Sequence, residues 1–282
     1  MTDTRIFGYA DPLAARAGAS VDFMISVEGR EEVSARLVRV LHGDENPEGP
    51  GYVEEAVEID LPAALAVKRQ FTQVGSFARA DDPDGRLDGL ASFTLFAHVF
   101  PTLPKAERQQ IMGRWDIEGS KGFGLGIDPD GHVAMWLGDG SGGDEIRTEI
   151  TLVPRCWYFV AASFDAATKQ AQLHVMNCVT QWNSRISTVV PFEGDSWIKE
   201  TLRHGPGATA GAASFKLASA TAYNPVRGHY GAFLFNGKID RSGVYGRVLG
   251  RDEVVALSKG AVPGADGLVA YWDATANLGR DG

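Results

Sequence analysis

The chain has 282 residues, 44% of them hydrophobic and 22% charged, which is typical of a soluble globular protein and not of a disordered or fibrous one. Its net charge of −9 argues against nucleic acid or an anionic membrane as the main partner. No segment approaches the roughly 18 apolar residues of a membrane span, and residues 1–5 are not followed by the apolar core of a signal peptide. A cytoplasmic location is therefore expected.

Residues 1–67 are predicted to form a small β domain. A strand-like run at 21–27 precedes a turn at 28–30 and an alternating strand at 33–37, whereas 61–67 carries no clear signal. The loop at 43–51 reads Gly-Asp-Glu-Asn-Pro-Glu-Gly-Pro-Gly, too rich in glycine and proline for regular structure. So short a unit buries little surface, and we expect it to lean on the rest of the chain.

Acidic residues are concentrated in this first domain. Seven carboxylates and no Lys or Arg lie between Asp44 and Asp60. We interpret them as a solvated acidic loop and edge strand in preference to a cation site.

From residue 68 the pattern becomes a succession of strands with turn signals between them. Strands or hairpins are predicted at 70–80, 91–101, 109–116, 122–137, 155–177, 212–220, 231–245 and 267–274, with a separating stretch at 221–231. A single short helix is predicted at 251–257, with Val254, Val255 and Leu257 as its apolar side. About a dozen strands with almost no helix predict a two-sheet antiparallel sandwich.

The first internal hairpin turns at residues 128–131, and its register is open. If Ile127 faces His132, then Phe123 pairs with Trp136. A slip of one residue instead places a glycine opposite Trp136.

The second hairpin bears on the two cysteines. If Asp165 lies opposite Lys169, one apolar face contains Trp157, Phe159 and Ala161 together with Val175, Leu173 and Ala171. The same register sets Cys156 opposite Cys178, where a disulfide is sterically allowed. In a reducing cytoplasm, two free half-buried thiols are the preferred interpretation.

The segment 235–257 resembles the closing segment of laminin-G-like, concanavalin-type jelly rolls. The matching residues are Gly237, Ile239, Asp240, Tyr245, Arg247, Leu249, Glu253 and Leu257. Earlier pieces at 74–101, 122–140 and 156–175 resemble preceding strands of that fold in the same order. The resemblance covers about residues 68 to 275. It implies an all-β chain, with a jelly-roll sandwich at 68–282 after the small domain at 1–67. The short helix would plug a hole at the sandwich edge.

A narrower resemblance concerns the first domain. Residues 8–29 and 37–51 look like the start of the large (beta) subunit of N,N-dimethylformamidase-type amidohydrolases, in which a small β domain, a laminin-G-like domain and a catalytic domain follow one another. The resemblance implies a parent reaction that hydrolyses small N-substituted formamides to formate and an amine. It also implies a mononuclear iron site, with tyrosine and glutamate ligands, in a C-terminal domain beyond Gly282. No iron ligand can be carried onto this chain.

On this interpretation the chain is a non-catalytic β portion that serves assembly and active-site access in an oligomeric hydrolase. Its expected partners are the catalytic domain and a small subunit. The alternative is a free-standing laminin-G-like module that binds carbohydrate or protein through a sheet or its loops.

The residues themselves supply no catalytic, cofactor-binding or metal-binding assignment. The six histidines, none in metal-binding spacing, are His42, His98, His132, His174, His204 and His229. We interpret His98 and His174 as core or edge residues of strands. No Gly-x-Ser-x-Gly elbow occurs, and the glycines of 122–131 lie in a strand, not in a phosphate loop. The carboxylates of 81–88 and 139–145 are calcium candidates, although plain turns are preferred and neither matches an EF-hand.

Tryptophans are candidates for a sugar-binding platform. They are Trp115, Trp136, Trp157, Trp182, Trp197 and Trp272. Trp157 and Trp272 are predicted to fill the core between the sheets. The faces of Trp115 and Trp136 depend on hairpin register.

Overall fold

A computed structural model describes residues 4–178, 195–209 and 211–274. The chain divides into two compact units, Met1–Thr72 and Gln73–Gly282, and the predicted boundary after residue 67 lies just before this division. Within the described ranges, no helix is long and apolar enough to cross a membrane.

The first unit consists of three two-stranded antiparallel sheets. They pair β1 (Arg5–Asp11) with β2 (Asp22–Glu28), β3 (Glu32–Val33) with β6 (Leu65–Ala66), and β4 (Leu37–Gly43) with β5 (Tyr52–Val57). The predicted strand at 33–37 is wrong, because β3 ends at Val33 and β4 begins at Leu37. The loop predicted after Gly43 is confirmed, and the Asp44 carboxylate accepts the Asn46 N–H within it.

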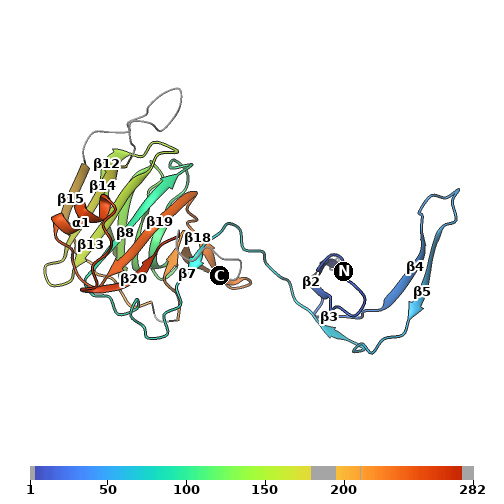
Figure 1. Ribbon diagram of the computed structural model, residues 1–282. Helices are drawn as coiled ribbons and strands as arrows, with labels where there is room; N and C mark the ends of the chain where they lie inside the picture. Colours follow the sequence, from blue (N-terminus) through green and yellow to red (C-terminus); the bar gives the residue numbers. More distant parts are fainter. Residues whose placement is uncertain (1–3, 179–194, 210, 275–282) are drawn as a thin grey trace, which may run out of the picture. The chain divides into compact units, whose positions relative to one another are not determined.

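The second unit is a sandwich of two sheets, as predicted (Figure 1), and its strand pairs are antiparallel apart from a short parallel contact of β17 with β9. The six-stranded sheet has the order β15 (Asp195–Thr201), β14 (Gln170–Asn177), β13 (Tyr158–Asp165), β8 (Phe93–Pro101), β19 (Gly237–Tyr245), β20 (Leu268–Trp272). The other sheet runs β12 (Gly143–Thr151), β11 (His132–Asp139), β10 (Lys121–Ile127), β9 (Gln109–Asp116), β16 (Lys216–Leu217), β7 (Ala78–Arg79), with β17 (Ala220–Asn224) and β18 (Gly228–Ala232) attached.

The core between the sheets follows from period-two alternation. In β8 the alternate residues Phe93, Leu95, Ala97 and Val99 are fully buried in one cluster. From the opposite sheet, Phe123 stacks on Phe93 with ring centroids 4.4 Å apart. The alternation therefore fixes which face of each strand closes the sandwich.

The only helix of the described residues, α1 (Arg251–Ser258), covers the outer face of the six-stranded sheet. Val254 and Leu257 pack there on Phe96 and Phe159, so the helix covers a sheet face and does not plug an edge hole. Ser258 is buried and Val255 only half-buried, which corrects the predicted apolar side.

The start of α1 is stabilised by local charge. The Glu253 carboxylate accepts the Gly250 N–H at 2.8 Å and pairs with Arg247 through two nitrogens. The acidic residues of the first turn also suit the positive end of the helix dipole.

The β10–β11 hairpin adopts the second of the two registers considered. Gly124 lies opposite Trp136 and Phe123 opposite Leu137. The reason lies in β10, whose core-facing apolar residues alternate with Gly122, Gly124 and Gly126 on the other face. The Trp136 ring occupies the space above Gly124 and Gly126, where any β-carbon would overlap it.

The β13–β14 hairpin is shifted by one residue from the predicted register. Asp165 lies opposite Gln170, because Lys169 takes a left-handed conformation (φ 58°) that lengthens the turn. Phe159 and Ala161 consequently face α1 and not the core. Both cysteines are free: Cys156 belongs to the inter-sheet core, whereas Cys178 packs on the opposite side of the sheet. This shift removes the geometry for a disulfide.

Two further predictions of strand placement are wrong. The stretch 70–80 contributes only β7, and the separating stretch 221–231 forms most of the β17–β18 hairpin. Strands β12 and β15 were not predicted, because their sequences are rich in charged residues.

We predict that Gly124→Ala destabilises the second unit by about 1–3 kcal/mol, because the added methyl group must displace the Trp136 ring. Chemical denaturation measures the loss. Gly89→Ala is the matched control, since a β-carbon at Gly89 meets nothing within 4 Å. Equal stability of the two variants would contradict this account of the register.

Candidate functional site

A hollow of about 380 Å³ opens on the outer face of the β9–β12 part of the larger sheet. Its lining includes Arg108, Trp115, Ser120, Trp136, Glu145 and Phe233. Gly124 and Gly126 of β10 make room for the Trp136 ring at its floor, because a β-carbon at either position would overlap that ring. We call this region the glycine trough.

Trp136 forms the base of the trough and is only 3% exposed. The indole ring of Trp136 packs on Gly124 and Gly126, and the Arg108 guanidinium lies over the ring, 4.9 Å from its centroid. Glu145 holds Arg108 in an ion pair. Trp136 therefore offers no open platform for a sugar ring, and its indole N–H has no hydrogen-bond partner.

Trp115 is the tryptophan of the trough that remains partly exposed. It lies opposite Gly122 on β10, and its ring comes near Gly138 on β11. An aromatic ring beside a fixed Arg–Glu pair can stack on an apolar face and hydrogen-bond polar groups. Sequence periodicity alone could not assign this face, because it depends on the register of β10.

Trp157 and Trp272, two other candidate tryptophans, pack against neighbouring aromatic rings. Trp272 packs against the core and stacks on Phe215 at 5.7 Å, as predicted. The prediction for Trp157 is wrong: its ring lies 5.4 Å from Phe100, and Tyr158 occupies the core instead. Trp182 lies outside the described residues.

The carboxylates of 139–145 hold the chain segment at residues 203–204. Asp144 accepts the N–H groups of Arg203 and His204, each at 2.7 Å. Asp139 accepts hydrogen bonds from Ser141 and lies 3.1 Å from the His204 ring, and these bonds depress the pKa of Asp139. Since Ser141 donates to Asp139 and not to histidine, the group is no nucleophile–base pair.

The acidic residues at 81–88 also have protein partners. Asp82 accepts the N–H groups of Arg86 and Leu87, and Asp88 lies 3.0 Å from Arg114. These contacts of Asp82 and Asp88 fit a turn stabilised by its own carboxylates.

One further group, which sequence spacing did not single out, contains Asp128, Asp130 and His132 in the β10–β11 turn. Its ligand atoms lie within 4.8 Å of one another, but Arg147 lies 3.0 Å from Asp128. Burial alone would raise the pKa of Asp128, yet hydrogen bonds from His132 and Arg147 hold it below its usual value. The arginine thus supplies the positive charge that a cation would bring.

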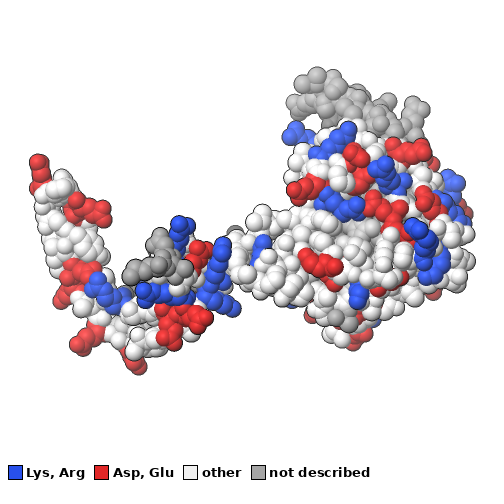
Figure 2. Space-filling model, turned by 180° about the vertical axis from the view of Figure 1, so that it is seen from behind, with Lys and Arg blue, Asp and Glu red and all other residues white. Residues whose placement is uncertain are grey.

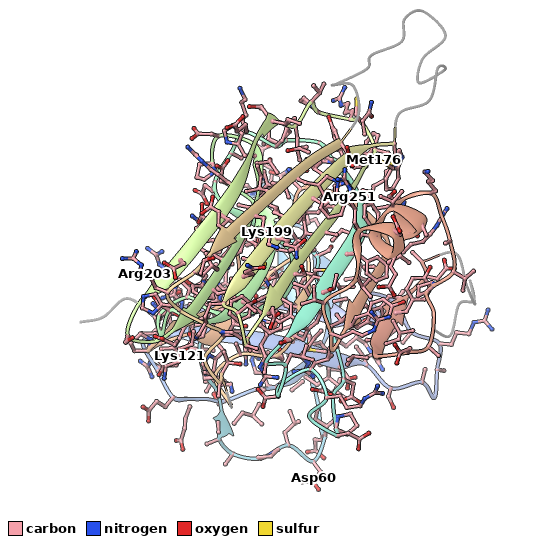
Figure 3. The ribbon with its side chains drawn as sticks, turned by 90° about the vertical axis from the view of Figure 1, so that its left-hand side faces the viewer. Asp60, Lys121, Met176, Lys199, Arg203 and Arg251 are labelled. Atoms are coloured by element: carbon pink, nitrogen blue, oxygen red, sulfur yellow. The ribbon has the colours of Figure 1, made fainter. Side chains whose placement is uncertain are left out.

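A second cluster lies beneath α1, where His174 of β14 is 1% exposed. Its ring stacks on Trp197 at 4.0 Å, and Asp195 lies 3.4 Å away. Arg251, labelled beside Met176 in Figure 3, lies 3.7 Å from Asp195 and over the Trp197 ring. Burial lowers the pKa of His174 to about 4, although Asp195 opposes this shift. His174 is therefore a neutral strand residue, as predicted for this position.

We predict that His174 lowers the free energy of unfolding as the pH falls. The folded pKa of about 4 lies below the ordinary 6.5, so this contribution is complete above pH 6.5 and is lost as pH falls toward 4. Denaturation between pH 7 and 4 should show wild type losing about 1 kcal/mol per pH unit more than His174→Phe, which keeps an aromatic ring without the charge. Parallel pH profiles for the two proteins would contradict the assignment.

Comparison with known proteins gives a match over the whole chain. The N,N-dimethylformamidase beta subunits of Paracoccus aminophilus and of an Alcaligenes species are each 34% identical to it. The matched regions comprise 100% of this chain and 37% of each relative, so the chain spans little more than a third of their length. No protein-family model matches.

Solved structures with a similar fold include the Ruminococcus gnavus IT-sialidase CBM40, at 18% identity and a TM-score of 0.48, over 66% of this chain and 94% of that one. The LG1-3 region of the laminin alpha2 chain matches 62% of this chain and 31% of its own, at 13% identity and a TM-score of 0.41.

The whole-length sequence match confirms the expected resemblance. This chain is related to N,N-dimethylformamidase beta subunits and corresponds to a region of that larger polypeptide.

Proposed function

We propose that this chain is the non-catalytic N-terminal β portion of an N,N-dimethylformamidase-type large subunit, serving assembly and access to the active site. Hydrolysis of small N-substituted formamides to formate and an amine would take place in the remainder of the parent polypeptide. The observation that carries this proposal is the match to all of this chain but only 37% of its relatives.

The use of its polar side chains supports a scaffolding role. Asp139 and Asp144 hold a neighbouring segment, Asp128 ties Arg147 to the β10–β11 turn, and Asp195 lies between His174 and Arg251. Each of these carboxylates is engaged by groups of the protein itself. The Ser141 hydroxyl donates to Asp139, but the lowered pKa of that carboxylate makes it a weak base.

Iron is implied for the parent enzyme by the family resemblance, with tyrosine and glutamate ligands. Two tyrosines of the sandwich, Tyr158 and Tyr245, do not fit that role. The Tyr158 hydroxyl bonds the Val153 backbone, and the Tyr245 hydroxyl donates to the Gly264 carbonyl. Burial raises the pKa of both phenols, which disfavours the phenolate that binds a metal. In this proposal the iron is held in the remainder of the parent polypeptide.

The test is an assay for formate and dimethylamine released from N,N-dimethylformamide. We expect the purified chain, supplied with ferrous or ferric iron, to release neither product above the protein-free rate. The longer polypeptide read from the same gene, with any co-purifying small subunit, should release both. Hydrolysis by the 282-residue chain alone would overturn the proposal.

A second candidate is binding of carbohydrate or protein at the glycine trough. It is favoured by the partly exposed Trp115 beside the Arg108–Glu145 pair in a hollow of about 380 Å³. Trp136 is a poor probe of this function, because glycine and arginine already cover its ring and its replacement would disturb the sheet.

A glycan array with Trp115→Ala tests this second candidate. Any glycan bound by wild type should be lost or weakened at least about tenfold in this variant, because the stacking surface is removed. Trp157→Ala, which alters a half-buried tryptophan outside the trough, serves as the control. Equal binding by both variants, or no binding by wild type across the array, would remove carbohydrate as the ligand.

A further inference from the structure

The first unit exposes most of its large apolar side chains. Among the described residues of this unit, Val27 is the only buried hydrophobic one. The exposed ones are Ile6, Phe7, Tyr9, Leu13, Phe23, Met24, Leu37, Val40, Leu41, Tyr52, Val53, Ile59 and Leu61. So large an uncovered apolar surface marks an interaction site in a natural protein.

The clearest patch lies on one face of the β1–β2 pair. Tyr9 is directly opposite Met24, and Phe7 lies two residues along the same face. Their exposed fractions are 64%, 43% and 58%, respectively. We call these three side chains the docking face. Aromatic residues and methionine are enriched at the buried centres of protein interfaces.

The reverse face of the same hairpin is also apolar. Ile6 and Phe23 lie on that face and are 60% and 67% exposed, respectively. Strands that carry apolar residues on both faces are typical of sheets covered on both sides. An isolated two-stranded hairpin is only marginally stable in water, so this hairpin needs a covering surface.

The second unit does not offer an apolar surface of matching extent. Its exposed large hydrophobic residues, among those described, are Val74, Leu103, Tyr223, Val226 and Val262. Tyr223 and Val226 belong to the β17–β18 hairpin, whereas Val74, Leu103 and Val262 lie in three separate loops. Figure 2 shows a surface on which basic and acidic side chains are interspersed. Its own apolar residues are already used between its sheets and beneath α1.

Charge indicates what borders the complementary surface. Residues 1–72 contain thirteen carboxylates and seven Lys or Arg residues, and so hold −6 of the chain's formal charge of −9. The net negative charge of the first unit favours a partner surface that carries lysine and arginine.

We propose that the docking face packs against the part of the parent beta subunit that lies outside this chain, on an apolar surface bordered by Lys and Arg. This rests on the proposed function, since the relatives continue well beyond the 37% of their length that this chain covers. That remainder is the one occupant whose presence follows from the sequence match. Covering the patch would supply the first unit with the core it lacks.

The test mixes the 282-residue chain with the beta-subunit segment encoded after residue 282 in the same gene, and follows methionine oxidation by peroxide with mass spectrometry. Met24 is 43% exposed, whereas Met112 and Met135 are fully buried and act as internal references. We expect Met24 to oxidise quickly in the chain alone and at least tenfold more slowly in the complex.

Variants then identify the contact. Phe7→Thr, Tyr9→Thr and Met24→Thr combined should weaken the complex at least about tenfold, because they remove the apolar surface while retaining strand-forming residues. The matched control combines Tyr223→Thr and Val226→Thr, which alter exposed apolar residues of the second unit and should leave affinity unchanged. Sedimentation of labelled chain measures both affinities.

Several outcomes would overturn the inference. In one, Met24 is already protected in the monomeric chain alone, so the chain covers its own patch. In another, the chain alone forms a dimer that the triple variant abolishes, which makes a second copy the occupant. In a third, the triple variant binds the segment as tightly as the control. These results differ from failure of the proposed function, in which the longer polypeptide does not hydrolyse N,N-dimethylformamide.

Discussion

The sandwich depends on how β8 divides its side chains between two cores. Phe93 and Leu95 point into the space between the sheets, while Phe96 points to the outer face where α1 packs. Because successive side chains of a strand leave opposite faces, one central strand anchors both clusters. A one-residue slip of β8 would turn Phe93 and Leu95 away from the inter-sheet core and Phe96 away from α1. The closed inter-sheet core and the helical cover are therefore consequences of one register.

The same constraint shapes the glycine trough. In β10 the core side is occupied by Phe123, Leu125 and Ile127, so the residues between them must face outward. These are glycines, and the space they leave is filled by Trp136 under the Arg108 guanidinium. The hollow beside Trp115 is thus a by-product of how the sheet accommodates a large ring on its outer face. Its chemistry, aromatic with a fixed ion pair, suits recognition more than bond cleavage.

The two units differ in how completely they bury their own apolar side chains. The second unit buries its large side chains in two clusters, and its carboxylates Asp128 and Asp144 are paired with its own donors. The first unit exposes aromatic residues and methionine from β1 and β2. This chain is related to roughly a third of a larger subunit. Exposed apolar residues are expected on a unit that packs against the rest of that subunit. The difference in burial is what the proposed assembly role would require.

The sequence alone determined the all-β sandwich, the strand at Phe93–Pro101 and the short helix after Gly250, because period-two alternation, turn residues and helix-start acids are local signals. It also indicated the family, through residues that the whole-length match supports. Tertiary structure decided the registers. The left-handed Lys169 shifted β14 by one residue, which separated Cys156 from Cys178 and moved Phe159 to the outer face. Trp115 and Trp136 could be placed only once β10 had its neighbours. Register depends on contacts between residues distant in the chain, and local patterns do not contain that information.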